Sequence, residues 1–129
     1  LTSHQAEWAA EVLGLKVPGH VRAGSLDTLQ RRKLLMACLL MRRPKVLLLD
    51  EPASGLLAAE LDELDQVLRI LVREMKIALL LVEHRLELLA AIADQVLVLD
   101  VGQCIATGTP EDVFGDSKVQ AAYFESATA

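Results

Sequence analysis

The sequence predicts an α/β fold in which parallel strands are flanked by helices, followed by a strand hairpin and further helices. Two short apolar runs, 46–49 and 77–82, have the length and composition of strands covered on both faces of a parallel sheet. The stretch 58–75 between them is amphipathic at helical spacing, and a strand–helix–strand unit places its strands parallel through a right-handed crossover. Aromatic residues make up only 3% of a chain that is 53% hydrophobic, so the core must be built from Leu, Val, Ile and Ala.

The other elements follow from periodicity and end signals. Gly14 is the expected stop of a first helix, and Asp27 with Gln30 three positions later resembles a capping box at the start of a second. Acidic residues crowd the first turns of 58–75, where carboxylates favour the helix dipole. In chain order we expect a helix over about 3–13, a loop over 16–25, a helix over 28–42, strands at 46–50 and 77–82 around the helix 58–75, a helix over 86–93, strands at 95–100 and 104–108, a helix from 110 and a helix over 118–124.

Composition and charge narrow the functional classes. The 129 residues are enough for one ordinary domain, and a net charge of −5 does not favour nucleic acid as a partner. We expect neither a membrane-spanning helix nor a signal peptide. Cys38 and Cys104 lie far apart without zinc-site spacing, which predicts two free thiols in a reducing cytosol. Because the chain starts at Leu1, we expect a fragment or a processed product.

Two carboxylates at the end of the first apolar run are the strongest functional signal. Asp50 and Glu51 come directly after the run and precede Pro52, at the strand end where open α/β sheets bind ligands. One carboxylate there can hold a hydrated magnesium ion, and the next can polarise an attacking water. His84 follows the second run. The alternative is a buried strand that ends in a solvated turn, but the paired acids, the proline and the second strand with its histidine favour function.

The predicted sheet is small for strands that are this apolar. Three or four strands leave an open edge that is costly to expose. We therefore expect more sheet, supplied by sequence outside these residues or by a partner.

The residues that end the two apolar runs resemble motifs of the ATP-binding-cassette (ABC) ATPases, which have a P-loop NTPase-like fold. The stretch 46–52 resembles their Walker B motif, and Ser54, Gly55 and Leu56 continue like their D-loop. Val82-Glu83-His84 resembles their switch-histidine loop. The tail from 108 onward is similar to the C-terminal extension of branched-chain amino-acid importers. The resemblance divides the chain into a signature-motif helical region, 1–45, a sheet region, 46–108, and a C-terminal helical extension, 109–129.

This resemblance implies a role for each matching residue. Asp50 would assist Mg²⁺ through water, Glu51 would act as general base or orient the attacking water, and His84 would contact the γ-phosphate of ATP. The D-loop residues 54–56 would communicate across a homo- or heterodimer of two ABC ATPase subunits. The implied protein is the ATP-hydrolysing subunit of an importer for branched-chain amino acids or similar small solutes. It would dock on an integral membrane permease and lie peripherally on the cytoplasmic face of the inner membrane.

The chain also departs from the family. The Walker A loop needs G-x-x-x-x-G-K-[ST], and no stretch provides it, so we expect these residues alone not to bind ATP in the usual way. The signature motif L-S-G-G-Q falls on Leu26, Asp27, Thr28, Leu29 and Gln30. Asp27 places a negative charge where the motif offers a hydroxyl, and Leu29 adds bulk where backbone must approach phosphate closely. One interpretation of the altered signature is that it binds the partner's ATP weakly. The other is that Asp27 simply caps the helix.

Three further interpretations remain open at the level of sequence. The chain could be a noncatalytic remnant or fragment that acts only by packing with a partner. It could be a soluble ABC ATPase of DNA repair or translation, although the importer-like tail argues against that class. The basic residues of the second helix and the loop after it are expected to form a solvated surface, with a phosphate contact by Arg31 as the alternative; they are Arg31, Arg32, Lys33, Arg42, Arg43 and Lys45.

Overall fold

The computed structural model describes residues 2–125, which fall into two compact units, 1–84 and 85–129. Leu1 and residues 126–129, the end of the predicted C-terminal extension, lie outside the described residues. The predicted element order is confirmed, with helix and strand boundaries that mostly lie within about two residues of the expected ones. None of the helices within residues 2–125 has the length and apolar character needed to cross a bilayer.

The first unit contains helical segments both before its first strand and between its two strands. They are α1 (Ser3–Val12), the short 3₁₀ turn η1 (Ala23–Ser25), α2 (Thr28–Leu40), α3 (Ala58–Arg69) and the π-helical segment η2 (Ile70–Glu74). Gly14, at φ 63°, ends the first helical segment as predicted. The single helix predicted over 58–75 is wrong in its last part: the turn widens, and the Met75 amide donates to the Ile70 carbonyl at 3.1 Å, five residues back.

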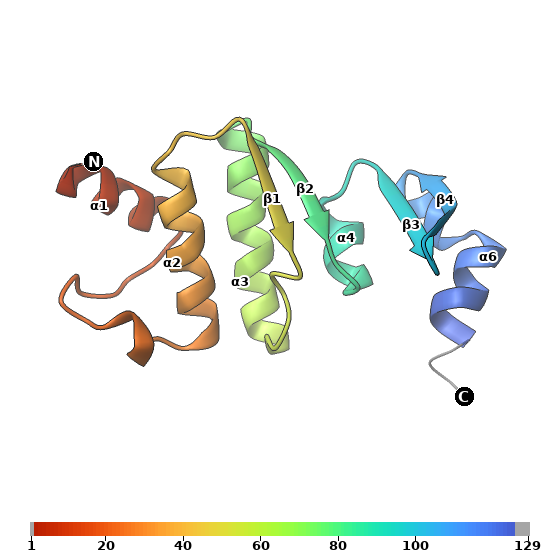
Figure 1. Cartoon of the computed structure of the whole chain (residues 1–129), viewed down its shortest axis with the longest axis horizontal. Helices are drawn as coiled ribbons and strands as arrows, with labels where there is room; N and C mark the ends of the chain where they lie inside the picture. The colour runs from red at the N-terminus through yellow and green to blue at the C-terminus, as the bar shows by residue number, and fades with distance from the viewer. Residues whose placement is uncertain (1, 126–129) are drawn as a thin grey trace. The chain divides into compact units, whose positions relative to one another are not determined.

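Two parallel strands carry the functional signal of the sequence. They are β1 (Val46–Asp50) and β2 (Ala78–Val82), joined through α3 as the strand–helix–strand pattern predicted (Figure 1). Their register pairs Val46 with Ala78 and Asp50 with Val82, so both strands end at the same edge of the sheet. This shared edge is what brings the segments that follow each strand close together.

The two strands are covered on one face, not on both as the sequence predicted. Leu47 and Leu49 are buried, and Leu64 and Leu68 of α3 are fully buried in the same unit. The alternate positions are exposed, with Leu48 at 68%. The other exposed members of this outer face are Val46, Leu80 and Val82. The continuous apolar run shows that both faces of the strand are suited to burial. Within the described residues, other side chains bury only one of these faces.

The second unit is a strand hairpin with short helices. It contains α4 (Leu86–Ile92), β3 (Val96–Asp100), β4 (Gln103–Gly108), α5 (Pro110–Phe114), α6 (Ser117–Val119) and the π-helical η3 (Gln120–Glu125). The helix predicted over 118–124 is thus a short α-helix followed by wider turns. Val101 and Gly102 both have positive φ, as a two-residue hairpin turn requires. A small core joins the hairpin to the helices after it; its buried residues are Val96, Val98, Val113 and Val119.

Candidate functional site

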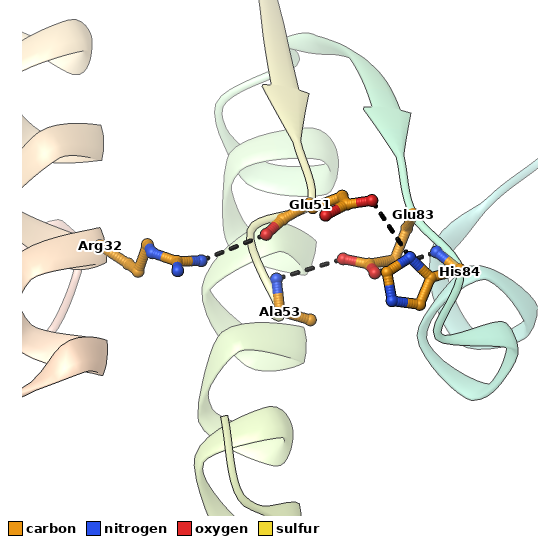
Figure 2. Close-up of polar contacts among 5 residues, drawn as sticks. All are labelled: Arg32, Glu51, Ala53, Glu83 and His84. Carbon is orange, nitrogen blue, oxygen red and sulfur yellow. Dashed lines mark hydrogen bonds and ion pairs between the residues drawn. The ribbon is translucent and has the colours of Figure 1, made fainter. Parts of the chain in front are cut away.

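Glu51 and His84 meet at the shared edge of β1 and β2. Glu51 Oε1 lies 3.2 Å from His84 Nδ1, and the two side chains are 48% and 62% exposed (Figure 2). The structure thus brings together the two residues predicted to be catalytic. Their exposure leaves both accessible to a ligand or a water molecule from outside.

The backbone at Glu51 is in an unusual conformation. Its φ is 46°, in the left-handed region that residues other than glycine seldom adopt. The Glu51 amide donates to the Val82 carbonyl at 2.7 Å, so the bonding between the strands continues one residue past β1. Beyond that bond the chain turns sharply away from the sheet. A conformation of this kind persists only when the surrounding structure fixes it.

Arg32 of α2 binds the backbone of this loop. Its Nη1 donates to the carbonyls of Pro52 at 2.6 Å and Glu51 at 3.2 Å, and its Nη2 donates to the carbonyl of Ser54 at 3.1 Å. The expectation of a solvated surface is therefore wrong for Arg32, because its planar group of donors fits three converging carbonyls. No sequence pattern pairs a helical arginine with a loop about twenty positions later, so this role was missed.

Glu83, directly after β2, also binds the backbone of this loop. Its Oε2 accepts from the Ala53 amide at 3.1 Å, and its Oε1 accepts from the His84 amide at 3.0 Å (Figure 2). Ala53 is 1% exposed, so Glu83 provides its amide with an acceptor that water could not easily replace. Glu83 was named only as part of the histidine motif. A carboxylate directly before a proposed functional histidine was the one signal that could have indicated its role.

The signature-like residues lie at the start of α2. Asp27 Oδ1 accepts from the Gln30 amide at 2.8 Å, and Gln30 Oε1 accepts from the Asp27 amide at 3.1 Å, which confirms the capping box. Asp27 is exposed, whereas Leu26 and Leu29 are buried. Thr28 is the first residue of the helix. The bulk of Leu29 therefore lies inside the unit, and the exposed feature of this helix start is the charge of Asp27.

The D-loop-like residues divide into two exposed positions and one buried one. Ser54 and Gly55 are exposed, and Gly55 has φ 76°, which suits glycine. Leu56 is 5% exposed and contributes to the core. A surface contact with a partner is thus open to Ser54 and Gly55, whereas the Leu56 side chain anchors the loop.

Asp50 ends β1 with an exposed side chain. Residues 2–125 contain no group of three or more His, Cys, Asp and Glu side chains placed to hold a metal ion together. A single exposed carboxylate fits Mg²⁺, because this ion keeps several of its waters and takes one or two protein carboxylates along with phosphate oxygens. Asp50 therefore fits the role of a magnesium partner through water.

Lys33 is the second basic residue that is not on a solvated surface. Its side chain is 9% exposed, and its Nζ lies 2.9 Å from Glu63 Oε2 of α3, whose side chain is 58% exposed. A hollow lies beside this ion pair, lined by residues from the loop after α1 and the starts of α2 and α3, among them Lys16, Asp27, Gln30 and Glu60. The pair ties α2 to α3 and so supports the helix that carries Arg32.

This ion pair predicts an asymmetric effect on stability. Glu63→Ala leaves the buried Lys33 ammonium without its carboxylate, and we expect the free energy of unfolding to fall by about 1 kcal/mol. Lys33→Met removes the charge but keeps the length, and we expect a smaller loss or none. Urea unfolding of the two single variants and the double variant measures the coupling. Equal losses from both single variants would contradict this account of the pair.

Comparison with known proteins shows which proteins this chain resembles. No family model matches the chain. The high-affinity branched-chain amino acid transport ATP-binding protein BraF of Pseudomonas aeruginosa is 37% identical over 124 residues, which cover 96% of this chain and 48% of BraF. The corresponding protein LivG of Escherichia coli K12 is 34% identical over 122 residues, 95% of this chain and 48% of LivG. The chain thus spans about half the length of the curated relatives it matches.

Solved structures give the same result for the fold. The cbiO1 protein of Clostridium perfringens, part of the ABC transporter complex cbiONQ, superimposes with a TM-score of 0.79 at 25% identity, over 97% of this chain and 51% of cbiO1. An ATP-binding cassette of an ABC transporter in its ADP conformation superimposes with a TM-score of 0.83 at 27% identity, over 94% of this chain and 49% of the cassette. This chain therefore resembles the C-terminal part of an ABC transporter ATP-binding subunit, and its fold is a part of the ABC ATPase fold.

Proposed function

We propose that these residues form the water-activating part of an ATP-hydrolysing subunit of an importer for branched-chain amino acids or similar small solutes. The observation that carries the proposal is the 3.2 Å contact of Glu51 and His84 at the shared end of two parallel strands. It stands together with the 37% identity to BraF. A carboxylate with an imidazole beside it can orient a water and accept its proton.

Each residue has a defined part in the proposed reaction, an in-line attack of water on the γ-phosphate of ATP. Glu51 orients the water and takes its proton. His84 keeps the Glu51 carboxylate in place, and its exposed imidazole would contact the γ-phosphate. Asp50 would hold Mg²⁺ through water, and that ion supplies charge neutralisation on the phosphates. The phosphate-cradling lysine of a Walker A loop would come from sequence outside these residues.

The proposed assembly follows the same resemblance. A second ABC ATPase subunit would face the start of α2 and the exposed Ser54 and Gly55. An integral membrane permease would hold the pair peripherally at the cytoplasmic face of the inner membrane. The outer face of β1 and β2, which is apolar and exposed, is where we expect another part of the ATPase domain or a partner to pack.

A chimera tests the proposal. The chain replaces the matching residues of BraF, and ATP hydrolysis is measured with Mg²⁺. Hydrolysis above that of BraF truncated to its remaining half supports the proposal, and hydrolysis equal to the truncated protein contradicts it. The purified chain alone should show no tight magnesium-dependent ATP binding, by calorimetry or with a fluorescent ATP analogue. Tight binding would contradict the expectation that the nucleotide site is incomplete without a Walker A loop.

A noncatalytic subunit that acts by packing with a partner is the second candidate. The exposed charge of Asp27 favours it, because a carboxylate at this helix start opposes a phosphate that approaches from a partner. The chimera also separates this candidate, since it would assemble with the permease without hydrolysing ATP.

The charge of Asp27 gives a further prediction in the same chimera. Asp27→Ser keeps a helix cap and removes the charge, so we expect faster hydrolysis with little change in helix stability. Asp27→Asn, a neutral cap, should give the same gain. Leu29→Gly is a poorer test, because Leu29 is 6% exposed and its removal would open a cavity. An unchanged hydrolysis rate in both neutral variants at all ATP concentrations would show that the charge is irrelevant.

A further inference from the structure

The carboxylate of Glu83 joins the loops that carry Glu51 and His84. One oxygen binds the Ala53 amide, two residues after Glu51, and the other binds the amide of His84 itself. The side chain is half-buried. Oε2 therefore ties the first loop to the second, and Oε1 fixes the His84 backbone within its own loop, next to the Glu51–His84 contact.

Within the described residues, the other hydrogen bonds of the first loop do not connect it to His84. Arg32 binds carbonyl groups of the first loop from the side of α2. The amide of Glu51 is bonded to the Val82 carbonyl at the strand end. Neither contact reaches residue 84. The backbone of His84 is linked to the first loop through Glu83, and the imidazole then reaches the Glu51 carboxylate from that fixed backbone.

We propose that Glu83 is a positioning residue, which sets the separation of Glu51 and His84 by bridging the two loops. It accepts two amide hydrogens at once, which an ionised carboxylate does well because it carries acceptors on both oxygens and no donor. The functional meaning of the separation rests on the proposed function, because that gives Glu51 and His84 their roles. The bridge itself is a property of this chain and is testable without nucleotide.

The test uses the full chain labelled with ¹⁵N and three variants. Glu83→Ala removes both acceptors. Glu83→Gln keeps one carbonyl oxygen and puts an amide donor in place of the other. Glu87→Gln is the matched control, since Glu87 is a neighbouring carboxylate, 65% exposed, with an ion contact to Arg85 at 3.8 Å. Hydrogen exchange is followed at the amides of Ala53 and His84, and the imidazole ¹⁵N shifts of His84 report its contact with Glu51.

We expect Glu83→Ala to speed exchange of the Ala53 amide about tenfold, as the loss of one buried hydrogen bond implies, while the Leu68 amide in the core keeps its protection. The His84 imidazole shifts should move toward those of the exposed His4 and His20. Glu83→Gln should restore protection at one of the two amides, and Glu87→Gln should change neither readout.

Two results would overturn the proposal. One is unchanged Ala53 exchange when both acceptors are gone. The other is faster exchange with unchanged His84 imidazole shifts, which would make Glu83 a merely structural contact. If Glu83→Ala also exposes the Leu68 amide and so unfolds the unit, Glu83→Gln decides by the same two readouts. An inactive BraF chimera with wild-type Glu83 would count against the proposed function and leave these results unaffected.

Discussion

Glu51→Gln in the BraF chimera is expected to slow ATP hydrolysis by at least about 100-fold, because the proposed general base is lost. Glutamine has the same size, and its carbonyl oxygen can still accept from His84 Nδ1, 3.2 Å away from the native carboxylate. Arg32 binds only the backbone of this loop, so the loop should keep its conformation. The variant therefore removes proton acceptance while leaving the geometry intact.

The kinetic pattern identifies the role. We expect kcat to fall while the KM for ATP changes little, since in the proposed reaction Glu51 acts on the attacking water and not on the nucleotide. Glu111→Gln, an exposed carboxylate of the second unit, serves as the control and should leave both constants unchanged. If Glu51→Gln kept more than about half of the activity, Glu51 could not be the main proton acceptor.

Leu68→Ala is expected to lower the free energy of unfolding of the first unit by about 2–5 kcal/mol. Leu68 is fully buried in α3, and alanine keeps the helix propensity, so the loss reports the cavity and the lost apolar contacts. Urea unfolding is followed by the fluorescence of Trp8, the only tryptophan, which belongs to this unit.

Leu48→Ala is the matched control for this substitution. The residue type and the change are the same, but Leu48 is 68% exposed on the outer face of β1, so we expect a loss below about 1 kcal/mol. Similar losses at both positions would mean that the outer face of the sheet is also part of a packed core.

The sequence predicted those features that depend on local patterns. The apolar run before Asp50 marked β1 at its true boundaries, and Asp27 with Gln30 marked the start of α2, because strand burial and helix capping are encoded within a few residues. The meeting of Glu51 and His84 followed from the parallel arrangement of the two strands.

Features that depend on contacts between distant segments could not be predicted. In the sequence Arg32 and Lys33 look like ordinary helical cations. Only the folded chain shows that Arg32 binds loop carbonyls and that the buried Lys33 pairs with the exposed Glu63. Leu48 was predicted to be buried but is exposed. A run of leucines indicates that the strand favours burial, but it does not say which segments pack against it. The widened turn at 70–74 depends on how the helix ends against β2, where the Ile77 amide bonds to the Leu71 carbonyl.

The loop after β1 is fixed through its main-chain atoms. Arg32 donates to three of its carbonyl oxygens, and Glu83 accepts from one of its amides. Main-chain atoms are the same whatever the side chain, so substitutions at most of these loop positions escape the contacts that shape the loop. In evolutionary terms, an exposed position such as Ser54 can change its side chain while the path of the loop stays the same, whereas the buried Ala53 cannot. A replacement of Glu51 would likewise leave these main-chain contacts in place, so the path of this loop and the chemistry of its side chains can change independently.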